Sequence, residues 1–71
     1  MIDVRECIKP AITQSGMKQI AVAQRAGLTQ QQLTDIINKR RKLEANEFVS
    51  ICDAIQTSPN DVLAYAVFER R

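Results

Sequence analysis

The chain has 71 residues and a formal net charge of +2, with 45% hydrophobic but only 4% aromatic side chains. Because so short a chain is at the lower end of the range that folds alone, we expect one domain spanning residues 1–71, a core of aliphatic side chains and little room for a catalytic cleft. With no histidine, two isolated cysteines and eight scattered acidic residues, no nucleophile-base pair or metal cluster is visible, so we expect neither an enzyme nor a cofactor.

The charge is unevenly distributed along the sequence. Between Lys9 and Lys42, seven basic residues stand against the single acid Asp35, a balance of +6. Residues 43–71 carry five acids and two arginines, a balance of −3. A domain with one basic and one acidic half would attract phosphate on one side only, which orients it on a nucleic acid. A solvated basic face without a partner is the alternative.

Two features bear on the cellular compartment. Cys7 and Cys52 are far apart in the sequence and have apolar neighbours, so we expect buried free thiols, with a disulfide or a metal ligand as alternatives. There is no signal-peptide pattern, and no apolar run approaches the ~20 residues that a membrane span needs. We therefore expect a cytoplasmic protein with no membrane partner.

The first of five predicted helices follows Asp3, which can act as an N-cap with Glu6 three residues later. Apolar residues recur on one side at helical spacing: Val4, Cys7, Ile8, Ala11 and Ile12. Pro10 leaves two alternatives, because proline removes a hydrogen bond from a helix interior: the helix is kinked, or it starts later with Pro10 in its first turn. Gly16 is expected to end it.

The second helix is predicted from about Lys18 to Ala26. Its core-facing residues are expected to be Ile20, Val22, Ala23 and Ala26, with Gln19 exposed. Gly27 supplies the positive φ that a tight turn needs, and Leu28 beside it can fill the gap before the next helix.

The third helix has the clearest local signature in the chain. Thr29 and Gln32 match a capping box, which places the start of the helix at Gln30. Leu33, Ile36 and Ile37 cluster on one side. The opposite side has no hydrophobic residue and consists of Gln30, Gln31, Thr34, Asp35 and Asn38.

Four consecutive cations, Lys39, Arg40, Arg41 and Lys42, follow in a predicted loop. A fourth helix is predicted from about Ala45 to Ile55, burying Phe48, Ile51, Cys52 and Ile55. The fifth begins after Ser58, with Pro59 at its first position, and carries Val62, Leu63, Tyr65, Ala66, Val67 and Phe68.

The second and third helices have the spacing of a helix-turn-helix, at about residues 18–38. This geometry needs a small residue where the helices cross, Ala23, and a glycine four residues later, Gly27. It also needs a hydrophobic residue beside that glycine and buried apolar residues in the second helix of the pair, which Leu28, Leu33 and Ile36 supply.

The chain resembles a known family through several segments: Gly16-Met17-Lys18-Gln19, residues 22–27 (VAQRAG), residues 29–33 (TQQQL), residues 51–55 (ICDAI) and residues 58–63 (SPNDVL). They match the phage-repressor and Cro-like, or Xre-type, helix-turn-helix regulators over roughly 50 residues. The resemblance implies an all-α fold, a five-helix domain of the lambda-repressor-like type, in which the third helix lies in the DNA major groove and the second crosses the backbone.

The resemblance also implies the base-reading positions. Gln30 and Gln31 lie at the start of the third helix, and a glutamine amide can bond adenine N6 and N7 together. Thr34 can contact a thymine methyl group. Asp35 has two alternatives: it accepts from cytosine N4, or it repels nearby phosphate. All four residues have a second alternative, as solvated helix residues without a ligand.

The same resemblance implies contacts with the DNA backbone, which position a protein without specifying sequence. Gln19 and Asn38 match family residues that donate to phosphate. Lys18 departs from the pattern, because relatives often place a helix-capping residue there, but it adds a cation near the backbone. Lys39, Arg40, Arg41 and Lys42 would run along the phosphates, or else form a solvated loop.

These features favour a sequence-specific double-stranded DNA-binding regulator of transcription, a repressor of bacterial, prophage or mobile-element type. One reading helix covers few base pairs, so we expect a symmetric homodimer on two half-sites about 34 Å apart. Tyr65, Val67 and Phe68 are candidates for its interface, or else for core packing. The alternative function is a protein-interaction module on the same fold, an antitoxin or a modulator of another repressor.

Overall fold

The predicted all-α fold with five helices is confirmed. The computed structural model describes the backbone of residues 3–69 and the side chains of residues 3–65, and this part of the chain contains helices but no strand. The helices are α1 (Arg5–Ser15), α2 (Gln19–Ala26), α3 (Gln30–Ile37), α4 (Ala45–Ala54) and α5 (Pro59–Glu69). The side chains of Val67 and Phe68, two of the three candidates for a dimer interface, lie outside the described residues.

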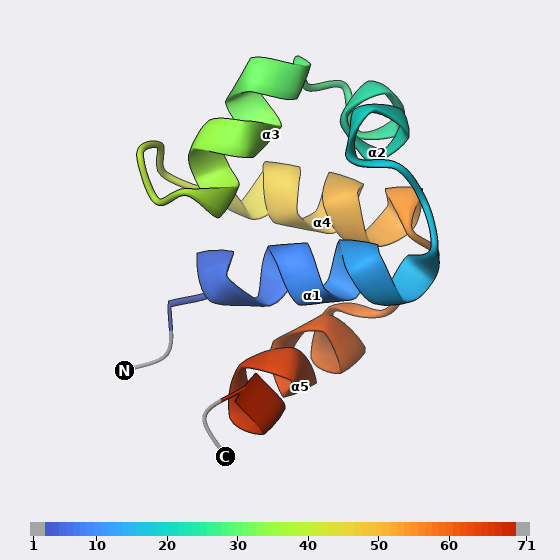
Figure 1. Cartoon of the computed structure of the whole chain (residues 1–71), viewed down its shortest axis with the longest axis vertical. Coiled ribbons are helices and arrows are strands. Elements are labelled where there is room, and N and C mark those ends of the chain that lie inside the picture. The colour runs from blue at the N-terminus through green and yellow to red at the C-terminus, as the bar shows by residue number, and fades with distance from the viewer. Residues whose placement is uncertain (1–2, 70–71) are drawn as a thin grey trace.

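The helices pack in a closed arrangement around one core (Figure 1). α2 packs against both α3 and α4, while α1 packs against α3 and α5, and α5 also contacts α4. As a result α3 lies at one end of the molecule and α5 at the other, with α1 between them (Figure 1).

The core is built from small aliphatic side chains and both cysteines. Its buried members are Cys7, Ile8, Ala11, Ile12, Val22, Ala23, Leu33, Ile36, Ile51, Cys52, Ala54, Ile55 and Val62. Cys7 and Cys52 are free thiols. Burial, together with Asp53 beside it, raises the pKa of Cys52, so this thiol stays protonated and unreactive.

The prediction that Ile20 faces the core is wrong, since 46% of this residue is exposed. The inner stripe of α2 runs i, i+3, i+4, i+7 and consists of Gln19, Val22, Ala23 and Ala26. Ile20 is one position, or about 100°, away from that stripe. Gln19 takes the inner place because a hydrogen bond to Thr34 of α3 satisfies its amide.

Pro10 lies inside α1, which is therefore not shortened by it. The helix begins at Arg5, with Val4 as the N-cap residue, so the predicted cap at Asp3 is displaced by one residue. The Asp3 carboxylate nevertheless accepts the main-chain N–H of Arg5 at 3.0 Å, which satisfies one of the donors at the helix start.

Four helices, α1 to α4, are followed by a residue in the left-handed conformation, and after α2, α3 and α4 this residue belongs to the same hydrogen-bonded motif. For α2 this residue is Gly27, and the N–H groups of Gly27 and Leu28 bond to the carbonyls of Gln24 and Ala23. Lys39 after α3 and Gln56 after α4 have the same pair of bonds at φ 64° and 54°. A residue with a Cβ atom is strained there by about 1–2 kcal/mol.

Replacing Gln56 by glycine should stabilise the protein by about 1 kcal/mol, because glycine adopts this conformation without strain. Gln56 is exposed, so the substitution removes no buried side chain. The free energy of unfolding, measured by urea denaturation, tests the prediction.

Gln24→Gly is the matched control, since it makes the same change at an exposed position inside α2. It should destabilise the protein by about 1 kcal/mol, because glycine is unfavourable in a helix interior. If both substitutions lowered the free energy of unfolding, the strain at Gln56 would not exist.

Candidate nucleic-acid interface

The turn between α2 and α3 fixes how the two helices cross. Gly27, at φ 76°, ends α2, and the N–H of Leu28 bonds back to the Ala23 carbonyl at 2.9 Å. Leu28 is half-buried and packs against the core, while Ala23 is almost completely buried. On the inner side of α3, Leu33 and Ile36 are fully buried. These contacts hold α3 by its inner face and leave its opposite face to solvent.

The start of α3 is closed by a capping box. The N–H of Gln32 bonds to the Thr29 hydroxyl at 3.0 Å, and the N–H of Thr29 bonds to the Gln32 side-chain oxygen at 2.9 Å. Because Thr29 and Gln32 are engaged with the backbone, the exposed amides of Gln30 and Gln31 are the ones available to a ligand at this end of the helix.

Two hydrogen bonds order the middle of the outer face of α3. The Gln19 amide donates to the Thr34 hydroxyl at 3.1 Å, which joins the start of α2 to α3. The Gln31 amide donates to an oxygen of Asp35 at 2.9 Å, one turn further along α3. Neither bond was predicted from the sequence. The first could have been found from the i, i+3, i+4, i+7 stripe of α2, which includes Gln19.

The four cations of the loop after α3 differ in their surroundings. Lys39 forms an ion pair with Glu6 at 2.7 Å, and Arg41 forms one with Glu47 at 2.8 Å. The main-chain carbonyl of Arg41 also accepts from Arg5 at 3.3 Å. The loop is therefore attached to the first turn of α1 on one side and to the first turn of α4 on the other.

Two carboxylates near these ion pairs, Asp3 and Glu47, have lowered pKa values. Hydrogen bonds from the side chain and the main-chain N–H of Arg5 lower the pKa of Asp3 from 3.8 to about 2. Burial by itself raises the pKa of Glu47, but hydrogen bonds from the Glu44 N–H and from Arg41 outweigh it and lower that pKa. The carboxylates of Asp3 and Glu47 thus keep their charge at neutral pH.

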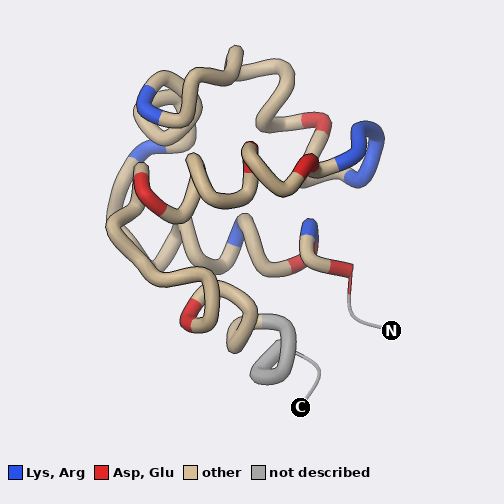
Figure 2. The backbone as a smooth tube through the Cα atoms, turned by 180° about the vertical axis from the view of Figure 1, so that it is seen from behind, with Lys and Arg blue, Asp and Glu red and all other residues tan. Residues whose placement is uncertain are grey.

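Arg40 and Lys42 are the outward-facing cations of the loop. Both are exposed, and within residues 3–65 neither forms an ion pair. Arg41 is turned inward instead, and its Nη1 atom is buried with no hydrogen-bond partner among the described residues. Figure 2 shows the loop as a continuous basic segment at the edge of the molecule with acidic segments beside it.

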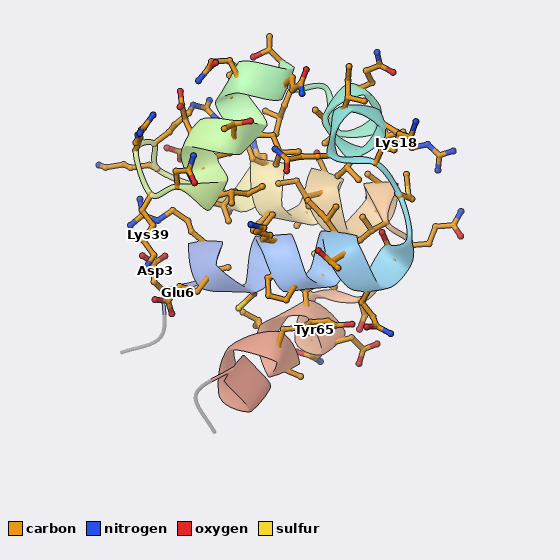
Figure 3. All side chains as sticks on the ribbon, viewed as in Figure 1. Asp3, Glu6, Lys18, Lys39 and Tyr65 are labelled. Carbon is orange, nitrogen blue, oxygen red and sulfur yellow. The ribbon has the colours of Figure 1, made fainter. Side chains whose placement is uncertain are left out.

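The basic and acidic halves of the sequence are therefore not two separate sides of the molecule. Glu6 and Glu47 come from outside the basic stretch, yet both touch its loop. Cations nevertheless flank α3 on both sides, since Lys18 at the start of α2 and Lys39 after α3 lie on opposite sides of it (Figure 3). Asn38, which the sequence predicts to contact phosphate, is exposed at the C-terminal end of α3.

Tyr65 lies on α5, at the far end of the molecule from α3 (Figure 3). Two open hollows adjoin it, one lined by Thr57, Asp61 and Ala64 and the other by Lys9, Pro10, Thr13 and Gln14. Among the described residues no group of histidine, cysteine and acidic side chains could hold a metal ion. In the same part of the chain, every helix is too short or too polar to cross a membrane.

Comparison with known proteins identifies a family. The model of the Cro/C1-type HTH DNA-binding domain matches residues 8–66, which is most of the chain and includes all of α2, α3 and α4. No curated protein matches the sequence.

Several solved structures share the fold at low sequence identity. The clp gene regulator ClgR from Corynebacterium glutamicum aligns with a TM-score of 0.84 at 18% identity, covering 96% of this chain and 88% of that one. The restriction-modification controller protein C.Esp1396I gives 0.81 at 21% identity, with 93% and 87% covered. The DNA-binding domain of the P22 c2 repressor gives 0.74 at 17%, with 84% and 79% covered.

The two arginines of the loop should differ in their effect on stability. Arg41→Ala removes the ion pair with Glu47 and the packing of the half-buried side chain, so we expect a loss of about 1 kcal/mol in the free energy of unfolding. Arg40→Ala, the matched control at an exposed position, should change it by less than about 0.5 kcal/mol. Equal effects in urea denaturation would show that Arg41 does not anchor the loop.

Proposed function

The chain belongs to the family of Cro/C1-type helix-turn-helix DNA-binding domains, and from this we propose that it is a sequence-specific regulator of transcription, a repressor of bacterial or prophage origin, in which residues 1–71 form one domain. The observation that supports this most is the outer face of α3. The helix is fixed by the burial of Leu33 and Ile36 on its inner side. Its outer face carries exposed amides at the N-terminal end and has cations on both sides. An α-helix of this kind fits the major groove of B-DNA.

In this proposal Gln30 and Gln31 are the main base-reading residues, because they combine exposure with paired donor and acceptor groups. Asp35 reads a base next to them. Thr34 contributes its methyl group to a thymine contact, since its hydroxyl already accepts from Gln19.

The phosphate contacts fall to residues on both sides of the reading helix. Lys18 and Gln19 act from the start of α2, and Asn38, Lys39, Arg40 and Lys42 act from the end of α3 and the following loop. Arg41, which we expected among them, serves to hold this loop in place, because its guanidinium is directed at Glu47. Such contacts neutralise phosphates and release counterions, so they make binding depend on salt.

We further propose that the protein binds as a homodimer. α3 has eight residues and is about 12 Å long, so a single copy reads only a few base pairs. Two copies related by a two-fold axis would place two reading helices in successive major grooves. Tyr65 and the adjoining hollows support an interface at α5, because this surface is far from α3 and would leave both reading helices free.

Binding variants should separate base reading from phosphate contact. After selection of bound sequences from a randomised duplex pool, Gln30→Ala and Gln31→Ala should each lose preference at particular base pairs, by roughly fivefold to a hundredfold, with a modest loss of non-specific affinity. Arg40→Ala should weaken all sequences alike and lower the slope of log K against log salt by about 1.

Arg41→Ala is the control for the loop, and it should leave that slope nearly unchanged, because Arg41 faces α4. Wild-type protein that bound every duplex equally, with no decrease as salt rises, would show that the chain is not a DNA-binding regulator.

The dimer is tested by sedimentation equilibrium with and without a two-half-site duplex. We expect two chains per duplex, and Ala64→Arg should reduce the bound stoichiometry to one because it adds a bulky cation beside Tyr65. Gln24→Arg, on the exposed side of α2, is the control and should still give two. One wild-type chain per duplex at saturating protein would contradict the dimer.

A further inference from the structure

We propose that Asp35 decides which bases Gln31 can read, by holding its amide in one orientation that accepts only from adenine or cytosine. This inference rests on the proposed function, since it concerns how α3 reads a base. It adds to the proposed base contact of Asp35 a second role, in which Asp35 acts through Gln31.

The two side chains form one unit on the surface of α3. Gln31 and Asp35 are separated by one helical turn, and the Gln31 Nε2 atom donates to Oδ1 of Asp35 at 2.9 Å. Gln31 is exposed, and within residues 3–65 Asp35 forms no ion pair that would neutralise its charge. The carboxylate of Asp35 is therefore free to attract the N–H of the Gln31 amide.

The chemistry of the amide explains why this contact matters. The oxygen and nitrogen of a glutamine amide occupy nearly the same space, so a free glutamine can turn by 180° and offer either an acceptor or a donor at the same point. An ionised carboxylate only accepts. Gln31 must therefore direct its nitrogen at Asp35, which turns its oxygen away from the carboxylate and towards a ligand in the groove.

The preference is weak in water and increases on binding. A side-chain bond across one helical turn biases an exposed pair by roughly twofold. Inside a groove from which water is displaced, the reversed amide would direct its oxygen at the carboxylate, and two acceptors would face each other with no donor between them. The penalty for the reversed orientation is therefore greatest in the bound complex, where the base is selected.

In the favoured orientation Gln31 presents its Oε1 acceptor and the one Nε2–H donor that Asp35 does not engage, and the second carboxylate oxygen of Asp35 is a further acceptor. Adenine and cytosine present an amino group in the major groove, at N6 and N4, and fit these acceptors. Guanine presents O6 and N7 and thymine presents O4, which are acceptors only, so they can bond the remaining Gln31 N–H but give no donor to Oε1 or to the carboxylate oxygen. Asp35 thus disfavours guanine and thymine at the base that Gln31 contacts.

The test uses the base pair whose preference is lost in Gln31→Ala. Four duplexes that differ only there are titrated by fluorescence anisotropy with wild-type protein, Asp35→Asn and Asp53→Asn. Wild-type protein should favour adenine or cytosine on the contacted strand, and Asp35→Asn should reduce this preference by roughly fivefold or more, because an amide lets Gln31 turn. Asp53→Asn makes the same charge change at an exposed position on α4 and should keep the preference.

Asp35→Ala gives a second measurement with the same expected result, and circular dichroism confirms that each variant is folded. An unchanged preference in Asp35→Asn and Asp35→Ala would overturn the inference while leaving the proposed function intact. Wild-type protein without preference for any duplex would overturn the proposed function itself.

Discussion

The hydrogen bond from Leu28 to Ala23 is the constraint on which the rest of the molecule depends. It closes the left-handed turn at Gly27, and the direction of the chain after that turn sets the angle between α2 and α3. Because no atom lies within 4 Å of where a Cβ atom of Gly27 would be, glycine is favoured there by its backbone conformation and not by crowding. With the angle set, burial of Leu33 and Ile36 presents the opposite face of α3 to solvent.

A second set of contacts decides what the basic loop can do. Its first residue, Lys39, holds a strained left-handed conformation and is paired with Glu6, while Arg41 is paired with Glu47. These pairs use two of the four cations to attach the loop to α1 and α4. The loop is thus a short fixed segment and not a uniform positive patch. Arg40 and Lys42 face outward without an ion pair within residues 3–65, and Lys39 is exposed but paired with Glu6.

Much of the fold was predictable because its signals are local. The capping box at Thr29, the glycines after α1 and α2, and Pro59 at the start of α5 each act within a few residues, so the five helices could be located from sequence. The left-handed ends at Lys39 and Gln56 could not, because neither residue type favours that conformation. Likewise the sequence pattern predicts Ile20 inside and Gln19 outside, because the hydrogen bond that satisfies Gln19 comes from another helix.

The residues of the candidate site were predictable from the sequence, but the hydrogen bonds and ion pairs among them were not. The outer face of α3 follows from helical periodicity, whereas the ion pairs of Lys39 and Arg41 join residues 33 and 6 positions apart along the chain. A third contact, between residues 15 positions apart, has a mechanical consequence. The bond between Gln19 and Thr34 links a residue at the edge of the helix pair to one in the centre of α3. In the proposed complex Gln19 would contact a phosphate and Thr34 a base, so a movement of the protein along the DNA would displace both contacts together.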